Sequence, residues 1–193
     1  MPATNEKYKA IVIGASAGGL FALSGIVEKL PQNYPVPIIV VQHRSKDQKD
    51  LLEEVLQNKS KIKIKQADEK EKIGKGVIYI APPDYHLLVE EDETFSLSAD
   101  EPVRFSRPSI DVLFETAAKV FKNNLAGIIL TGASSDGAAG IVAVKKYGGL
   151  TIAQDPNEAQ FPFMPAASIA TNEVKYIWKL QEILNFLLKI ADN

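Results

Sequence analysis

Short apolar runs alternate with longer amphipathic segments along most of this chain, and this alternation constrains the fold more than any other feature. The apolar runs are rich in Ile and Val, and such unbroken runs are typical of strands that helices cover on both faces. The order predicts an α/β fold with a doubly wound, mostly parallel sheet and helices on both faces. The five runs are residues 10–14, 37–42, 77–81, 125–131 and 150–154.

The segments between these runs have the spacing of helices. Residues 61–66 instead alternate lysine with apolar residues, which predicts a strand near an edge of the sheet with its lysines in water. Residues 86–89 and 95–98 flank an acidic, solvated turn and predict a small inserted β-hairpin. Helices are expected at 19–30, 48–56, 110–122 and 137–147, and a last helix carries Leu180, Ile183, Leu184, Leu187 and Leu188.

Composition excludes several classes of protein. The 193 residues fit one domain. The chain has no cysteine, so disulfides and thiolate metal sites are ruled out. Its 22 basic and 24 acidic residues give a net charge of −2, so we expect no nucleic-acid partner. No apolar run reaches the roughly 18 to 20 residues of a membrane span, and the first ten residues lack the apolar stretch of a secretory signal. We therefore expect a cytoplasmic protein without membrane insertion.

Three chemically reactive side chains follow predicted strands. Ser16 comes after the first strand, His43 after the second, and Asp136 shortly after the strand at 125–131. Parallel sheets place functional groups beyond the carboxyl ends of their strands, so these three side chains should meet at one edge. A hydroxyl nucleophile, an imidazole base and an acid that orients the base are what acyl transfer requires. The sequence therefore predicts a Ser-His-Asp hydrolase.

The segment around Ser16 supports this hypothesis only weakly by itself. Residues 14–18 match the pattern G-x-S-x-G, in which small neighbours let a serine stand on a tight strand-to-helix turn. The order Ser, His, Asp differs from the Ser, acid, His order of the α/β-hydrolase fold, which is therefore disfavoured.

Each residue also has a structural interpretation. Ser16 could cap a helix or belong to a phosphate-binding loop, His43 could be an ordinary core or surface histidine, and Asp136 could cap the helix that follows it. A dinucleotide site is a poor match, because Ser16 replaces the middle glycine of G-x-G-x-x-G and Gln42-His43 stands where an acid would bind ribose. The two histidines have no carboxylate cluster nearby, so neither a metal nor an organic cofactor is expected.

Longer segments carry more information than these single motifs. In chain order they are IGASAGG, VVQH, GVIYIAPPDYHLL, RPSIDVLFETAA, GIILTGASSDGAAG and KKYGGLTIAQDPNEAQFPFMPAAS, and together they extend over about residues 8–171. Their content and order resemble the catalytic domain of the chemotaxis protein-glutamate methylesterase (CheB) family. The resemblance implies a serine hydrolase with Ser16, His43 and Asp136 as its triad and no cofactor. Its substrates would be glutamyl methyl esters on the cytoplasmic helices of methyl-accepting chemoreceptors. It would also deamidate glutamines on the same helices.

The resemblance also implies roles for residues near the triad. The backbone N–H of Ala17 would stabilise the oxyanion. His86 and Arg107 match segments near the substrate rim, and a structural role is the favoured interpretation for both. Arg44, beside His43, is also a candidate for the rim, although a surface side chain is its favoured interpretation. Asp155 is the second choice for the catalytic acid.

Several positions depart from the family pattern. Ala17 stands where the family has Thr, Ala133-Ser134 where it has Met-Gly, and Arg44-Ser45 where it has Met-Pro. These departures motivate a second hypothesis, a CheB-like module that is catalytically weak or inactive and binds receptors or signalling partners. Only nine residues precede the first strand, so we expect residues 1–193 to form a single CheB-type catalytic domain without an N-terminal receiver domain.

Overall fold

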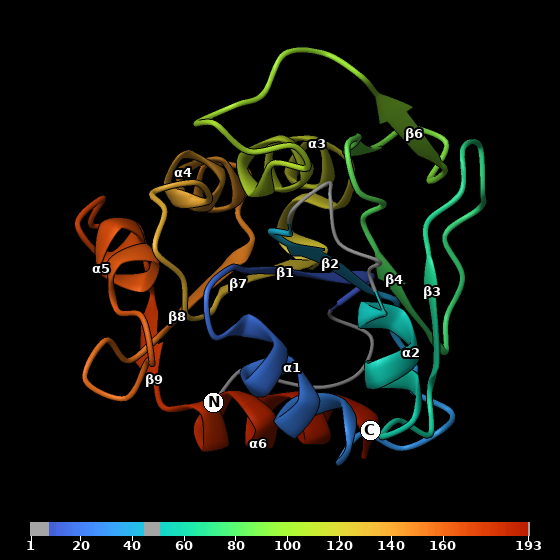
Figure 1. Ribbon diagram of the computed structural model, residues 1–193, viewed down its shortest axis with the longest axis horizontal. Coiled ribbons are helices and arrows are strands. Elements are labelled where there is room, and N and C mark those ends of the chain that lie inside the picture. The colour runs from blue at the N-terminus through green and yellow to red at the C-terminus, as the bar shows by residue number, and fades with distance from the viewer. Residues whose placement is uncertain (1–7, 45–50, 193) are drawn as a thin grey trace.

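A seven-stranded sheet with helices on both faces forms the body of the protein in the computed structural model, which describes residues 8–44 and 51–192 (Figure 1). All neighbouring strands of this sheet are parallel, so the predicted doubly wound α/β fold is confirmed. The strands are β1 (Ala10–Ala15), β2 (Ile38–Gln42), β3 (Lys63–Gln66), β4 (Val77–Ile80), β7 (Leu125–Ile129), β8 (Leu150–Gln154) and β9 (Tyr176–Trp178), in the spatial order β3-β4-β2-β1-β7-β8-β9.

Helices pack on both faces because β1, β2, β7 and β8 are mostly apolar and are buried at every position. Along β1, Ile11 and Ile13 enter the core under one layer of helices, while Ala10 and Val12 enter the core under the other. One layer holds α1 (Gly19–Val27), α2 (Leu52–Gln57) and α6 (Leu180–Ala191), and the other holds α3 (Ile110–Phe121), α4 (Ala138–Lys146) and α5 (Phe163–Ile169), with a 3-10 turn at Lys122–Asn124 (Figure 1). No helix among the described residues is long and apolar enough to span a membrane.

The inserted hairpin is present at the predicted residues. Its strands β5 (His86–Val89) and β6 (Phe95–Ser98) are antiparallel and separate from the main sheet. Leu87 and Phe95 are fully buried in the core beneath α3, and the ring of Phe95 meets that of Tyr79 edge-on at 4.9 Å. The predicted edge strand is also confirmed, because β3 ends the sheet with Lys63 exposed and Ile64 buried.

The sequence analysis did not predict strand β9 and helix α5, and both omissions have physical reasons. β9 has three residues, too few for any periodicity to show, and it pairs only with β8. α5 has seven residues and contains Pro165 in its first turn, where a missing N–H is tolerated but a helical pattern is hard to recognise. Residues 48–50 of the predicted second helix lie outside the described residues, and its described part begins at Leu52.

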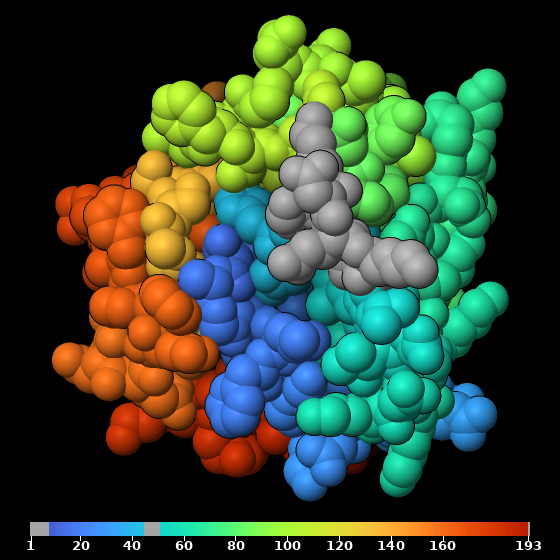
Figure 2. Space-filling model, viewed as in Figure 1, coloured from blue at the N-terminus to red at the C-terminus, as the bar shows by residue number. Residues whose placement is uncertain are grey.

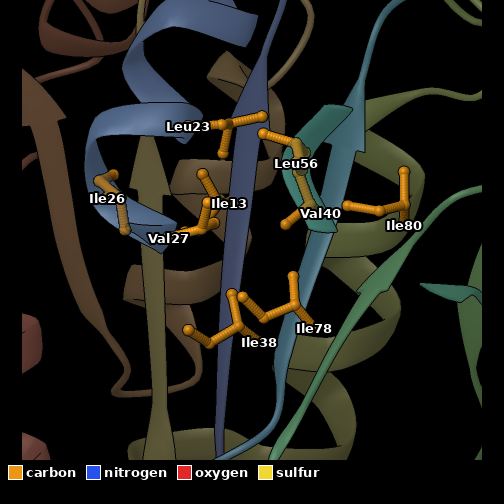
Figure 3. A pocket seen from close by; sticks show the side chains of 9 residues that line it. All are labelled: Ile13, Leu23, Ile26, Val27, Ile38, Val40, Leu56, Ile78 and Ile80. Atoms are coloured by element: carbon orange, nitrogen blue, oxygen red, sulfur yellow. The ribbon is translucent and has the colours of Figure 1, made fainter. Parts of the chain in front are cut away.

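A small void of about 10 Å³ lies in the core between α1, α2 and the sheet (Figure 3). All of its lining side chains are aliphatic, so a water molecule there would find no hydrogen-bond partner. The void is a packing imperfection and not a ligand site. Its lining residues are Ile13, Leu23, Ile26, Val27, Ile38, Val40, Leu56, Ile78 and Ile80.

The topology selects one place for a functional site. From β1 the chain builds β2, β4 and β3 on one side, and later returns to add β7, β8 and β9 on the other. In such open sheets the loops at the switch point diverge and leave a crevice beyond the carboxyl ends of the strands. The loops after β1, β2 and β7 therefore meet at the centre of one edge.

A buried tyrosine in the loop between α1 and β2 is hydrogen-bonded to the last helix. The Tyr34 side chain is 1% exposed, and its hydroxyl donates to the Leu187 carbonyl of α6 at 2.9 Å. We expect Tyr34→Phe to lower the free energy of unfolding by about 1 kcal/mol, measured by urea denaturation at pH 7, with Tyr85→Phe at a half-exposed site as the neutral control.

The same tyrosine should make stability depend on alkaline pH. Burial raises the pKa of Tyr34 above its ordinary value of 10.0, so its contribution is present below pH 10 and is lost as pH rises beyond it. The difference in stability between wild type and Tyr34→Phe should therefore shrink above pH 10. A difference that stays constant up to pH 11 would contradict this.

Candidate active site

Neighbouring strands bring Ser16 and His43 side by side. Ala15 and Gln42 are register partners in β1 and β2, and the two site residues are the next ones along each strand. The His43 N–H donates to the Ala15 carbonyl at 3.0 Å, and the Gln42 side chain donates to the Ser16 carbonyl at 2.8 Å. Ser16 and His43 thus occupy the predicted positions at the edge of the sheet. Figure 2 shows this face, where the blue, gold and orange segments after β1, β7 and β8 gather.

The serine is also tied to the end of β7. Its N–H donates to the Thr131 carbonyl at 3.0 Å. Gly132 lies directly against it, since a Cβ at that position would come within 2.9 Å of the Ser16 Cβ and 2.7 Å of the Met164 side chain. Only glycine permits this close approach. The loop after β7 can therefore pack beside the serine.

His43 and Asp136 form the central polar contact of the site. The His43 Nε2 lies 2.8 Å from the Asp136 Oδ2; the aspartate is fully buried and the histidine side chain is 12% exposed. Because the carboxylate accepts a hydrogen bond from Nε2–H, the ring carries its hydrogen on Nε2 and keeps a lone pair on Nδ1. If His43 acts as a base, it must therefore act through Nδ1.

The start of α3 surrounds the Asp136 carboxylate with donors. The Ser109 hydroxyl donates to Oδ1 at 2.8 Å, the Asp111 N–H donates to the same oxygen at 3.0 Å, and the Ile110 N–H donates to Oδ2 at 2.6 Å. Burial by itself would raise the pKa of Asp136, but the hydrogen bonds from His43 and from the two N–H groups outweigh it and hold the pKa below its usual value. The carboxylate is ionised and fixed in place.

A second buried carboxylate, that of Asp111 in α3, accepts hydrogen bonds from the start of α4. The Asp111 Oδ1 accepts from the N–H groups of Gly137 and Gly140 at 2.8 and 2.7 Å, at the start of α4, and Oδ2 accepts from Arg104 Nε at 3.0 Å. Burial, with the nearby charge of Asp136, raises the pKa of Asp111. Sequence reasoning missed Asp111, and it placed Ser109 near the site rim without predicting its contact with Asp136. Their only local signal was a serine and an acid at the expected start of a helix.

Asp136 therefore caps a helix, but not the one that sequence suggested. The structural interpretation of this residue was a cap for the helix that follows it. In the structure its carboxylate accepts from the start of α3, while Asp111 caps α4. The capping role and the contact with His43 coexist on one side chain.

The three residues expected near the substrate rim all have partners inside the protein. Arg44 differs most from expectation: its side chain is 8% exposed, not a surface group, and it contacts Glu53 at 3.0 Å and the Ala81 carbonyl at 2.8 Å. Arg107 donates to Asp84 and to two loop carbonyls. His86 is 2% exposed and links Glu101 to the Ser109 N–H. These side chains hold the loops around the site.

The remaining candidates also have clear places. Asp155 accepts from the backbone and side chain of Asn157 in its own turn, and among the described residues it is Asp136 whose carboxylate pairs with His43. The N–H of Ala17 makes no hydrogen bond to a described residue, and its carbonyl accepts from the Thr131 hydroxyl at 3.0 Å. The Ser16 hydroxyl is not hydrogen-bonded to His43 in the described part of the chain. Within residues 8–44 and 51–192, no group of three acidic or histidine side chains could hold a metal ion.

The chain is similar to known proteins in sequence and in fold. The model of a family described as CheB methylesterase matches residues 11–187. The chain belongs to the CheB methylesterase family. The resemblance read from the sequence is thereby confirmed, and the matched residues include all three members of the predicted triad.

Individual relatives of this CheB domain are similar over nearly its whole length. A putative protein-glutamate methylesterase/protein-glutamine glutaminase of Leptospira interrogans is 47% identical, with 96% of each chain covered. A protein-glutamate methylesterase/protein-glutamine glutaminase of Clostridium acetobutylicum is 33% identical, and the match covers 97% of this chain but 54% of that protein. The crystal structure of the Thermotoga maritima CheB methylesterase catalytic domain superposes with a TM-score of 0.90 at 33% identity, covering 95% of this chain and 98% of that one.

The donors around Asp136 make a substitution there informative. In Asp136→Asn, the amide nitrogen would face donors, among them His43 Nε2 and the Ile110 N–H, and would favour the tautomer with hydrogen on Nδ1. We expect the free energy of unfolding to fall by about 2 kcal/mol and ester hydrolysis to fall roughly 10⁴-fold. Urea denaturation and a methanol-release assay measure the two effects.

Asp155→Asn is the matched control, because it makes the same chemical change in the turn after β8. It should leave both quantities nearly unchanged. If Asp155→Asn abolished hydrolysis while Asp136→Asn did not, the acid would have been assigned to the wrong residue.

Proposed function

We propose that this CheB domain removes methyl groups from glutamyl methyl esters on the cytoplasmic helices of methyl-accepting chemoreceptors, with Ser16 as nucleophile. The observation that carries the proposal is the buried contact between His43 and the ionised Asp136, on the strand next to Ser16. A hydroxyl beside an oriented imidazole is the arrangement that acyl transfer needs. Such a substrate places the domain in the cytoplasm.

The reaction then follows from the tautomer of His43. Nδ1 takes the proton of the Ser16 hydroxyl as Oγ attacks the ester carbonyl, and the imidazolium that forms is stabilised by Asp136 at Nε2. The same proton goes to the leaving methoxide, which departs as methanol and leaves an acyl-enzyme. Water, deprotonated by His43, attacks that ester and releases the glutamate and free Ser16.

The oxyanion of each tetrahedral intermediate needs backbone donors. The Ala17 N–H follows the nucleophile and has no partner among the described residues. In the loop after β7, the Gly132 N–H donates to the Phe161 carbonyl, whereas that of Ala133 makes no hydrogen bond to a described residue. We assign Ala17 and Ala133 as the two donors. Since both act through backbone N–H groups, alanine at these positions removes no donor.

The same machinery suits the second reaction named for the relatives. A glutamine side chain carries a carbonyl in the same position as the ester, and the imidazolium can protonate ammonia as it leaves. The alternative, an inactive module that binds receptors, is less favoured, because the relatives of this domain are named as methylesterases and glutaminases. Neither reaction requires a metal or an organic cofactor.

Removal of the nucleophile tests the proposal directly. We expect Ser16→Ala to lower release of volatile methanol from a methyl-labelled receptor by at least about 10³-fold, because the acyl-enzyme cannot form. Ser98→Ala on the hairpin should retain full activity, and both variants should unfold at the wild-type temperature. Labelling by a serine-directed phosphonate should disappear in Ser16→Ala alone.

Two outcomes would overturn the proposal. Normal methanol release by Ser16→Ala would reject Ser16 as the nucleophile. A wild-type protein that binds the receptor, releases no methanol and resists the phosphonate would be the inactive module.

A further inference from the structure

An unusual turn lies in the loop that leads into α3. Val103 and Ser106 exchange both backbone hydrogen bonds, N–H to carbonyl, at 3.1 and 2.9 Å, and so enclose a two-residue turn. The enclosed residues, Arg104 and Phe105, have φ angles of 48° and 63°, in the left-handed region. Turns of this kind normally use Asn, Asp or Gly, because larger side chains are strained there. A phenylalanine is an unfavourable choice for this position.

Burial does not explain the phenylalanine. Phe105 is 104% exposed, the highest value among the exposed large apolar side chains of the described residues. A fully exposed ring contributes nothing to the core, so it cannot offset the strain of its backbone. Strained residues that persist without a structural benefit are concentrated at functional sites.

The turn is fixed beside the catalytic carboxylate. Arg104, the other residue of the turn, points inward: its Nε donates to Asp111 at 3.0 Å and its Nη1 donates to the Ser135 hydroxyl at 3.3 Å. Ser135 immediately precedes Asp136, and the same loop continues to Ser109, which also contacts Asp136. Arg104 therefore holds the turn at the Asp136 side of the site while Phe105 is left in solvent.

Exposed aromatic side chains also occur on the nucleophile side. Phe161 and Phe163 are 39% and 58% exposed, and their segment pairs with Gly132, the residue packed against Ser16. In Figure 2 the yellow-green segment near residue 105 and the orange segment near 160 border the same face, with the blue and gold segments between them. Exposed aromatic side chains therefore occur in both segments that border this face.

We propose that Phe105 is a specificity-determining residue that contacts an apolar side chain of the substrate's helix next to the glutamyl ester. The inference rests on the proposed function, since it concerns how the same site recognises a protein substrate. A glutamyl methyl ester alone is small, so a protein substrate must be distinguished by contacts outside the reacting group. A rigidly held, solvated aromatic ring supplies such a contact with little loss of conformational freedom.

Phe105→Asn tests the inference, because asparagine tolerates the left-handed backbone. We expect the unfolding temperature to stay the same or rise, while kcat/KM for a methylated receptor fragment falls about tenfold or more. Hydrolysis of N-acetylglutamate γ-methyl ester, which is too small to reach the ring, should not change. Phe105→Tyr should retain wild-type activity on both substrates.

Glu93→Asn is the matched control for relief of strain. Glu93 has a φ of 60° in the turn between β5 and β6, and its substitution should leave hydrolysis of both substrates unchanged. Unchanged turnover of the receptor fragment by Phe105→Asn would overturn the inference, as would an equal loss on both substrates, which would indicate a structural role. If the wild-type chain hydrolyses neither substrate, the proposed function fails first and the inference falls with it.

Discussion

Two buried carboxylates that each cap the other's helix hold the site together. Asp136 lies before α4 and accepts from the start of α3, whereas Asp111 lies in α3 and accepts from the start of α4. Their charges repel and burial disfavours both, so the pair is stable only because N–H and O–H donors, with His43 and Arg104, surround it. These hydrogen bonds also fix the position of His43, through Asp136, and that of the turn at Arg104 and Phe105, through Asp111.

The placement of Ser16, His43 and Asp136 at one edge of the sheet could be predicted because it depends on topology alone. Once the apolar runs are taken as parallel strands, the residues that follow them must meet at one edge, and Ser16, His43 and Asp136 do so in order. Ser109 and Asp111 could not be found in this way. Their role exists only where α3 and α4 meet, and nothing in the local sequence says which helix start faces which carboxylate.

The burial and the partners of long polar side chains could not be predicted from the sequence either. Arg44 was expected at the surface, yet its side chain is 8% exposed and contacts Glu53 in α2 and the Ala81 carbonyl after β4. The fold itself was easier to predict, since the strands at its centre have nearly continuous apolar patterns. The elements that were missed, α5 and β9, are short and lie toward the β8 end of the sheet, where fewer neighbours constrain the sequence.

The departures from the family pattern acquire a consistent meaning in this structure. Alanine at 17 and 133 keeps the backbone donors but removes the longer side chains that the family carries beside the nucleophile. Contact with a protein substrate must then come from residues farther out. Those that the structure offers are aromatic and lie on both sides of the site, from the strained turn before α3 to the segment that begins α5. On the proposed assignment the reaction needs only backbone donors at these two positions, and recognition of the substrate falls to side chains farther from Ser16.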